Sequence, residues 1–277
     1  MSNIKSKYRR PLNDDQLYVL ELLFRFRFGD SAMLATCFDK PSSKSVQKRL
    51  KILEDQGYIA KRYDKSYKLL GKPAAHYLLP KGAKLFRAHI EKPDDIPDQA
   101  IKNRYKDKDA SDKFINHSFG IFNVYLKLHS LYEDRLAFIT KFEIDPKRDD
   151  FPKWLPDVYM RLKGGAKGTG KEKQFFLDLF EESMPFFVRV RRIKSYLTFA
   201  QNEQWDGELP IILIICETTS TQKRLRRRIA KEIDELWDDV AVFYTTTKQE
   251  LADSTKENDK IWQLATDNEA MKSLAQM

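Results

Sequence analysis

The sequence has only two cysteines among its 277 residues, Cys37 and Cys216, and neither has a neighbouring ligand at metal spacing. A disulfide framework and a structural zinc site are therefore not expected. Long apolar runs are also missing, since the longest near the middle of the chain, residues 211–216, is too short to span a bilayer. Residues 1–14 lack the apolar stretch of a signal peptide. These absences predict a soluble, cytoplasmic protein with no membrane partner.

Acidic residues are scarce in the first third of the chain. Residues 1–90 contain 19 Lys and Arg against 8 Asp and Glu, a net charge of +11, whereas residues 91–277 contain 31 against 33, a net charge of −2. This asymmetry indicates a polyanion-binding module joined to a nearly neutral second part. A solvated basic surface without a binding role is the alternative interpretation.

Apolar spacing in residues 1–90 predicts the element order of a winged helix-turn-helix. Asn13 is a good N-cap, apolar residues recur at helical spacing after it, and Gly29 is expected to end this first helix. Two more helices, two strands joined by a loop rich in Lys and Gly, and a closing helix follow. These segments span residues 30–38, 43–57, 58–63, 76–80 and 80–90.

The third of these helices has the pattern of a recognition helix. Val46, Leu50 and Leu53 fall on one face and should point inward, which leaves the polar face for the major groove of duplex DNA. The predicted DNA-binding residues are Ser43, Lys44, Gln47, Lys48 and Lys51 on the helix, and Lys61, Arg62, Lys65 and Lys68 on or near the wing. A winged helix used for protein contacts is the alternative.

Residues 91–110 are polar, contain two prolines and show no apolar periodicity. They are predicted to form a linker or an extended excursion. The expected domains are therefore a winged-helix domain over 1–90, a linker over 91–110 and a second domain over 111–277.

Residues 111–277 predict a helix, three strands, and then alternating helices and strands. The strands flanking KGGAKGTGKEK should form a hairpin, and the apolar strand over 210–216 should be central and buried. This order matches a restriction-endonuclease-like mixed-sheet domain, so the expected fold class is α+β or α/β. The predicted helices span 111–134, 186–204, 220–239 and 261–277, and the predicted strands span 136–145, 157–162, 174–180, 210–216 and 240–246.

Two further features of this half have ordinary interpretations. His117 and His129 lie on one helix about three turns apart, too far to share a metal, and are expected to be satisfied or surface side chains. The last helix carries apolar residues that could pair subunits into a homo-oligomer, although packing on their own domain is favoured. These residues are Ile261, Trp262, Leu264 and Leu274.

Residues 165–171 nearly form a phosphate-binding loop of the type G-x-x-x-x-G-K-[ST]. Glu172 occupies the Ser/Thr position, where a carboxylate would repel phosphate. The segment that follows is strand-like, so no helix N-terminus faces the loop. A hairpin tip is the better interpretation.

Asp157 and Asp178 occupy the positions of the two carboxylates that hold magnesium in a restriction-type nuclease. The lysine expected two residues later on the same strand face is replaced by Phe180, which can neither carry charge nor hold a water. Lys194 on the following helix is the tentative replacement for this lysine, and Glu143 is a tentative further metal ligand. We favour a nuclease-like domain without catalysis or a cofactor. The alternative is a magnesium-dependent DNA endonuclease that uses both aspartates.

The succession of segments resembles the replication-relaxation family of plasmid and mobile-element proteins. The segments that carry the resemblance are LNDDQLYVLELL, SVQKRLKILEDQGYIAKR and GKPAAHYLLPKGAKLF for its winged helix, NHSFGIFNVYL for a histidine-containing helix, and LPDVYMRL, FFLDLFEES and IKSY for a degenerate nuclease-like half. The resemblance implies DNA binding in plasmid replication, mobilisation or transcription control, with no established catalysis.

We therefore expect a DNA-binding accessory or regulatory protein of a plasmid or mobile element. Double-stranded DNA is the expected partner, with replication or mobilisation proteins as further candidates. Arg224, Arg227 and Arg228 could add a second DNA contact, although a solvated helix face is the favoured interpretation.

Overall fold

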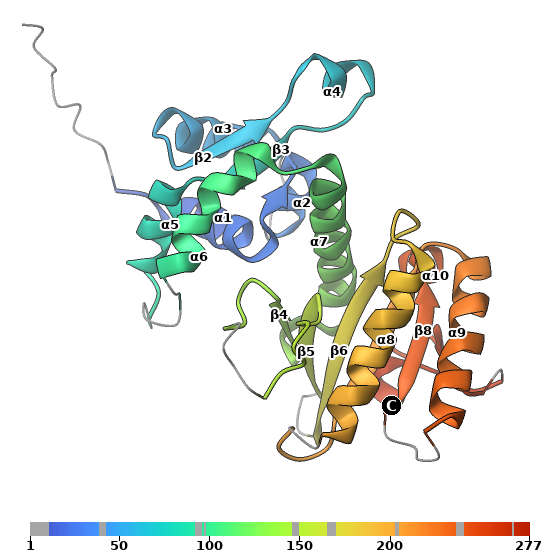
Figure 1. Cartoon of the computed structure of the whole chain (residues 1–277). Helices are drawn as coiled ribbons and strands as arrows, with labels where there is room; N and C mark the ends of the chain where they lie inside the picture. Colours follow the sequence, from blue (N-terminus) through green and yellow to red (C-terminus); the bar gives the residue numbers. More distant parts are fainter. Residues whose placement is uncertain are drawn as a thin grey trace, which may run out of the picture. The chain divides into compact units, whose positions relative to one another are not determined.

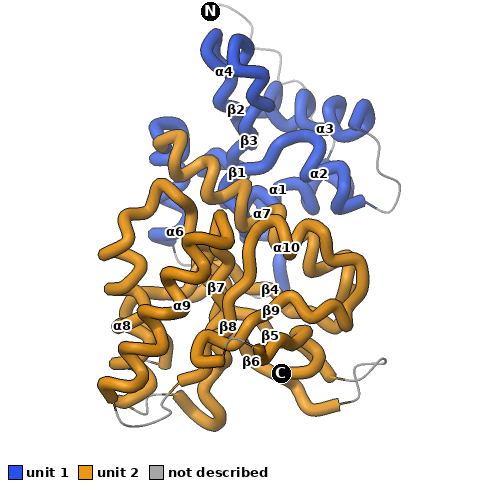
Figure 2. Tube along the Cα trace, turned by 90° about the vertical axis from the view of Figure 1, so that its right-hand side faces the viewer, with its two compact units in different colours: residues 1–110 blue, residues 111–277 orange. Residues whose placement is uncertain are grey.

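The structure is a computed structural model that divides into two compact units, Met1–Ala110 and Ser111–Met277 (Figure 2). The residues that it describes are 11–38, 43–91, 96, 98–145, 150–164, 170–202, 205–236, 241–267 and 269–277. Within these ranges no helix is both long enough and apolar enough to cross a bilayer. The tip of the predicted hairpin, residues 165–169, lies outside the described residues.

Unit 1 consists of short helices around an antiparallel sheet whose described strands have the order β1-β3-β2 (Figure 1). Its elements are α1 (Asp14–Phe26), β1 (Phe28–Gly29), α2 (Ser31–Thr36), α3 (Ser43–Asp55), β2 (Ile59–Arg62), α4 (Lys65–Leu69), β3 (Ala75–Leu78), α5 (Pro80–Arg87), α6 (Asp98–Lys102) and the 3₁₀ helix η2 (Asn103–Asp109). The sequence predicted α1, α2, α3, β2, β3 and α5. It did not predict β1, which is too short to show alternation, or α4, which lies in the Lys- and Gly-rich loop.

Helix α1 begins as predicted but ends earlier. The Asn13 side chain accepts a hydrogen bond from the Gln16 N–H at 3.0 Å, and the Gln16 side chain accepts one from the Asn13 N–H at 3.1 Å. The helix was expected to run to Gly29. It stops at Phe26 because Arg27 adopts a left-handed backbone conformation, with φ +68°, and Phe28 and Gly29 then join the sheet.

Helix α3 presents one apolar row to the interior of unit 1. Val46, Leu50 and Leu53 are all at most 2 % exposed, as their spacing predicted. Gly57 follows the helix with φ +71°, a conformation that glycine adopts without a Cβ penalty. The chain then turns so that the Tyr58 N–H bonds to the Leu53 carbonyl oxygen at 3.0 Å.

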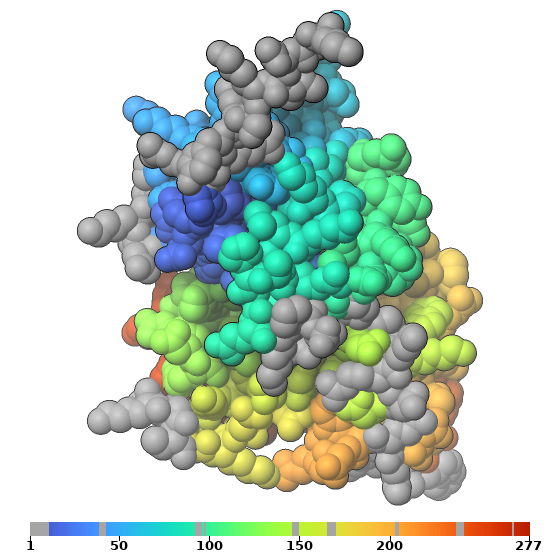
Figure 3. Space-filling view, turned by 90° about the vertical axis from the view of Figure 1, so that its left-hand side faces the viewer, coloured from blue at the N-terminus to red at the C-terminus, as the bar shows by residue number. Residues whose placement is uncertain are grey.

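The prediction of an irregular linker over 91–110 is wrong for residues 98–109, which form α6 and η2 and lie against α5 (Figure 3). Ile101, Arg104 and Asp107 are nearly fully buried. Arg104 donates to the Phe24 carbonyl oxygen at 3.1 Å and lies 4.4 Å from the centre of the Phe24 ring. Asp107 pairs with Arg27. The segment shows no apolar period because two of its three buried side chains, those of Arg104 and Asp107, are charged.

Unit 2 is a mixed sheet with helices on both faces (Figure 1). Its elements are α7 (Asp112–Tyr132), η3 (Glu133–Arg135), β4 (Leu136–Thr140), β5 (Val158–Lys163), β6 (Glu172–Phe180), α8 (Phe186–Gln201), β7 (Ile211–Cys216), α9 (Thr219–Asp234), β8 (Phe243–Thr247), α10 (Lys248–Asp253), β9 (Trp262–Leu264), β10 (Met271–Lys272) and the 3₁₀ helix η4 (Leu274–Gln276). The described strands have the order β10-β9-β8-β7-β6-β5-β4, so the predicted central position of β7 is confirmed.

Strand direction and side-chain alternation determine which helix covers which face. Strand β7 pairs in parallel with β6 and β8, and β6 pairs antiparallel with β5 as the predicted hairpin. Phe176 and Phe180 of β6 belong to one apolar cluster with residues of α8 and α9. Leu179 points to the opposite face, where a Cβ on Gly120 of α7 would lie only 2.5 Å from its Cδ2. Helix α7 therefore packs closely on β6.

The predicted C-terminal helix over 261–277 is wrong, and β8 is not the last strand. Strand β9 pairs antiparallel with β8, β10 pairs with β9, and the short helix α10 precedes them. Trp262 and Leu274 are each 1 % exposed, so both pack within unit 2. The helix prediction fails because β9 and β10 are short, and pairing with the edge of the sheet decides their conformation.

Gly82 of α5 marks a close approach of helix and turn in unit 1. A Cβ at this position would lie 2.3 Å from the Tyr58 carbonyl oxygen, which also accepts the Leu79 N–H at 2.9 Å. Gly82→Ala should therefore lower the free energy of unfolding by about 1–3 kcal/mol. Helix propensity alone predicts a change of about 1 kcal/mol in the opposite direction. Urea titration of Gly82→Ala beside the exposed Lys84→Ala tests this, and a stabilised Gly82→Ala protein would contradict it.

Candidate functional site

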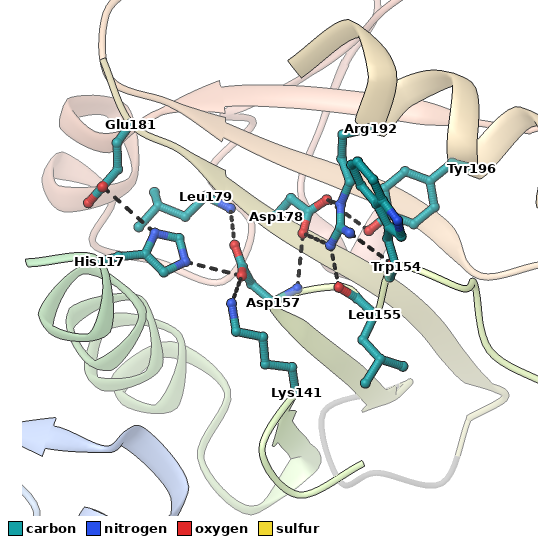
Figure 4. A network of polar contacts seen from close by, with 10 residues as sticks. All are labelled: His117, Lys141, Trp154, Leu155, Asp157, Asp178, Leu179, Glu181, Arg192 and Tyr196. Atoms are coloured by element: carbon teal, nitrogen blue, oxygen red, sulfur yellow. Dashed lines mark hydrogen bonds and ion pairs between the residues drawn. The ribbon is translucent and has the colours of Figure 1, made fainter. Parts of the chain in front are cut away.

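A pocket of about 310 Å³ in unit 2 contains both predicted aspartates. Its lining residues come from α7, the end of β4, the segment before β5, β6 and α8 (Figure 4). They are His117, Lys141, Trp154, Leu155, Asp157, Asp178, Phe180, Met184, Val188 and Arg192. Charged side chains thus lie beside aromatic and aliphatic side chains in this pocket.

The pairing of β5 with β6 brings the two aspartates together. Val158 pairs with Leu177 in antiparallel register, so the adjoining positions, Asp157 and Asp178, lie opposite each other. The Asp157 N–H donates to Asp178 Oδ1 at 2.9 Å, and the Leu179 N–H donates to Asp157 Oδ2 at 3.1 Å. Each carboxylate therefore replaces a backbone acceptor of the neighbouring strand.

Asp178 is 1 % exposed and its carboxylate is fully engaged. Arg192 donates from Nε at 2.6 Å to Oδ2 and from Nη2 at 2.8 Å to Oδ1, and Tyr196 donates its hydroxyl to Oδ2 at 2.9 Å. Burial and the Asp178 carboxylate raise the pKa of Tyr196 well above its usual value, so the phenol keeps the proton that it donates. This bidentate guanidinium contact is the geometry in which arginine pairs most strongly with a carboxylate.

Arg192 also joins the pocket wall to α8. Its Nη1 donates to the Trp154 carbonyl oxygen at 2.8 Å, and its Nη2 donates to the Leu155 carbonyl oxygen (Figure 4). Burial alone would lower the pKa of Arg192, but the Asp178 carboxylate raises it, so the guanidinium stays charged. Nothing in the spacing of Arg192 on α8 distinguishes it from Arg191, so its role was not predicted from the sequence.

Asp157 has a separate set of cations. Lys141 Nζ lies 2.7 Å and His117 Nε2 lies 3.1 Å from its Oδ1. Burial opposes ionisation of this carboxyl, but Lys141 and His117, with Arg192 nearby, hold its pKa well below the usual range. Asp157 is therefore an anion at neutral pH, although it is only 8 % exposed.

His117 is satisfied by polar partners, as expected, and it is also part of the site, which was not predicted. Its Nδ1 lies 3.8 Å from Glu181 Oε2, so a carboxylate faces each nitrogen of the ring. Burial favours the neutral ring, but the interactions with the Asp157 and Glu181 carboxylates outweigh it and raise the pKa of His117 to about 9. The only sequence signal for His117 was the resemblance of NHSFGIFNVYL to the histidine-containing helix of the family, since Glu181 and Asp157 reach the ring only through the fold.

The remaining predicted nuclease residues are placed differently. Phe180 lines the pocket and packs into the apolar cluster under α8. Lys194 lies outside the pocket and pairs with Glu232 of α9 at 3.2 Å. Glu143 also lies outside the lining residues and accepts the Thr140 N–H at 2.8 Å. Neither Lys194 nor Glu143 therefore lines the pocket with the two aspartates.

The donor set does not fit a divalent cation in this arrangement. Magnesium needs carboxylate oxygens that converge on one point, whereas Asp157 is held by Lys141 and His117 and Asp178 by Arg192 and Tyr196. In the part of the chain that the structure describes, no group of three or more His, Cys, Asp or Glu is arranged to hold a metal.

A second candidate surface lies on unit 1. Opposite its buried apolar row, α3 exposes five polar residues that the sequence predicted as DNA-binding. They are Ser43, Lys44, Gln47, Lys48 and Lys51. Lys65 and Lys68 are exposed on α4.

Two predicted wing residues are already bound within unit 1. Lys61 pairs with Glu54 at 3.0 Å while remaining exposed. Arg62 is half-buried and donates to the carbonyl oxygens of Lys108 at 3.1 Å and Ala110 at 2.8 Å. Arg62 thus holds the end of η2, a role the sequence did not predict because the segment around Lys108 was expected to be a linker.

The basic strip expected on α9 is partly engaged in unit 2. The Arg224 guanidinium lies 3.9 Å from the centre of the Phe186 ring, and Arg228 pairs with Glu232. Arg227 is exposed.

The raised pKa of His117 predicts a pH dependence of stability. A folded pKa of about 9 against an unfolded value near 6.5 means that the stabilisation is complete below about pH 6.5 and is lost as pH rises through 9. The full loss is at most about 3 kcal/mol. In denaturant titrations between these pH values, His117→Gln should show a smaller fall than the wild type. His129→Gln, on the same helix, is the matched control, and an equal fall in both variants would contradict the prediction.

The comparisons with known proteins support one family. A family model described as Replication-relaxation matches residues 20–211, a range that includes most of α1 and every lining residue of the pocket. Neither the curated proteins nor the solved structures contain a significant match. The matched range covers more than half of the chain, and it confirms the resemblance seen in the sequence. This protein therefore belongs to the replication-relaxation family.

Proposed function

We propose that this protein is a DNA-binding accessory or regulatory protein of a plasmid or mobile element, acting in replication, mobilisation or transcription control. Family membership supports the link to replication of such elements. The observation that carries DNA binding is the exposed polar face of α3, which combines three lysines with Ser43 and Gln47 opposite a fully buried apolar row.

Unit 1 is proposed to be a winged helix. The order α1, β1, α2, α3, β2, β3, with β1 and β2 on either side of β3, supports this assignment. Helix α3 is 13 residues long, and a helix of this kind fits the major groove of B-DNA. Residues 39–42, which join α2 to α3, lie outside the described residues.

The side chains of α3 suit two kinds of contact. Gln47 can pair with an adenine edge, and Lys44 and Lys48 can contact guanine or phosphate. Lys51 lies one turn further along and suits the phosphate backbone. The absence of acidic residues among the first nine positions of α3 keeps this face attractive to a polyanion.

Unit 2 is proposed to be a restriction-endonuclease-like domain that does not cleave DNA. Its carboxylates lie at the paired β5 and β6 positions that such a site requires, but Arg192 and Lys141 already neutralise them. Phe180 fills the position of the missing lysine. We infer that this unit serves assembly or a second contact with DNA.

Charge reversal on α3 tests the proposed interface. Lys44→Glu combined with Lys48→Glu should abolish binding to mixed-sequence duplex at low salt, because two phosphate-facing or base-facing cations become anions. The slope of log K against log salt, measured for a weakened single variant, should fall by about 1 for each lost phosphate contact.

The matched control for that experiment is Lys84→Glu combined with Lys102→Glu. These lysines are exposed on α5 and α6 of the same unit, so the net charge changes equally. The control should retain most of the affinity. Equal losses in the two double variants would show that only total charge matters, and would contradict docking through α3.

A magnesium-dependent DNA endonuclease is the alternative function, because Asp157 and Asp178 line one pocket. Supercoiled plasmid incubated with the purified chain and magnesium or manganese should stay uncut, since neither aspartate is free to bind a cation. Arg192→Met should not introduce cleavage, because Phe180 still blocks the lysine position. Nicking by the wild type that is lost in Asp157→Ala would establish the enzyme instead.

A further inference from the structure

The tip of the β2–β3 connection carries two strongly exposed leucines. Leu69 is 87 % exposed and Leu70 is 67 % exposed, more than any other large apolar side chain in the described ranges. Moving a leucine side chain out of water is favourable. Two adjacent leucines left in water therefore indicate a surface that is covered when a partner binds.

The leucines are held in place and are not part of a loose loop. Asp64 caps α4 by accepting the N–H groups of Ser66 at 2.8 Å and Tyr67 at 3.1 Å. The Tyr67 side chain is 4 % exposed and anchors the helix to unit 1. Gly71, with φ +62°, ends the turn, and the Lys72 N–H bonds back to the Tyr67 carbonyl oxygen at 2.9 Å. The exposed pair therefore projects from a capped and closed helical turn.

The charge around this turn identifies the chemistry of its partner. Residues 61–73 contain five Lys or Arg and one acidic residue, Asp64. Lys65 and Lys68 are exposed beside the leucines, and Lys68 Nζ lies 5.7 Å from the centre of the half-exposed Tyr63 ring. Two exposed leucines surrounded by basic side chains complement a polyanion whose interior is apolar. Stacked base pairs between phosphate backbones have this character.

We propose that Leu69 and Leu70 form an apolar wedge that inserts between base pairs of duplex DNA from the minor groove and kinks it. Lys65 and Lys68 contact the flanking phosphates. Apolar wedges of this kind partly unstack a base step and bend the duplex toward the major groove. Strand β2 leads from the end of α3 to α4, so one segment of chain links the helix proposed for the major groove to the wedge (Figure 1). This inference rests on the proposed DNA binding by unit 1.

The test separates bending from binding. A short duplex selected from a random pool by the wild-type chain carries a donor and an acceptor dye at its ends, and a second version carries 2-aminopurine at successive positions. With the wild type, energy transfer between the ends should rise and 2-aminopurine should brighten at one step. Leu69→Ala combined with Leu70→Ala should remain within about tenfold of wild-type affinity, because the burial gained and the unstacking cost nearly offset. It should lose both signals.

Two controls complete the experiment. Leu69→Met combined with Leu70→Met keeps the apolar wedge and should keep both signals. Phe187→Ala removes another exposed apolar side chain, 64 % exposed on α8, and should change neither. Circular dichroism should show the same helix content in all variants, because none of these side chains is buried.

The possible failures are distinguishable. Wild-type chain that does not bind duplex at low salt would overturn the proposed function together with the wedge. Binding that survives while Leu69→Ala with Leu70→Ala still bends and unstacks the duplex would overturn the wedge alone. Self-association of the wild type in sedimentation that is lost in the alanine variant, with bending unchanged, would assign the leucines to a second copy of the chain instead.

Discussion

The pairing of Arg192 with both carboxylate oxygens of Asp178, a buried residue on β6, is the interaction on which the pocket of unit 2 depends. The same guanidinium holds the backbone before β5 through the Trp154 and Leu155 carbonyl oxygens. Asp178 in turn accepts the N–H of Asp157, and Asp157 binds Lys141 and His117. The ion pair thus links the end of β6 and the segment before β5 to the middle of α8, and Asp157 extends the network through His117 to α7. The charge pairs of the pocket therefore stabilise the packing of these elements in unit 2.

Cations of the chain itself pair with both carboxylates of the pocket. The repulsion between Asp157 and Asp178 is therefore offset within unit 2. Phe180 lies beside them, and its ring belongs to the apolar cluster beneath α8. On unit 1, by contrast, α3 and α4 expose lysines to solvent.

Much of the fold followed from sequence periodicity, and the failures arose where contacts between distant segments decide the structure. Alternation and turn residues placed the β5–β6 hairpin and therefore Asp157 and Asp178, while the apolar run Ile211–Cys216 gave the central strand. Arg192, Lys141 and His117 were missed because their partners are distant in sequence. The segment 98–109 and the strands β9 and β10 were missed because a buried charge pair and edge-strand pairing stabilise them, and neither produces an apolar period.

The helical segment α6–η2 also decides where unit 1 can be cut from the chain. Arg104 covers the Phe24 ring, and Asp107 neutralises the guanidinium of Arg27. A fragment ending at residue 90 would lose the Arg104 side chain from the Phe24 ring and Asp107 from Arg27. Any fragment of unit 1 prepared for crystallisation or for fusion to another protein has to retain the chain as far as Ala110.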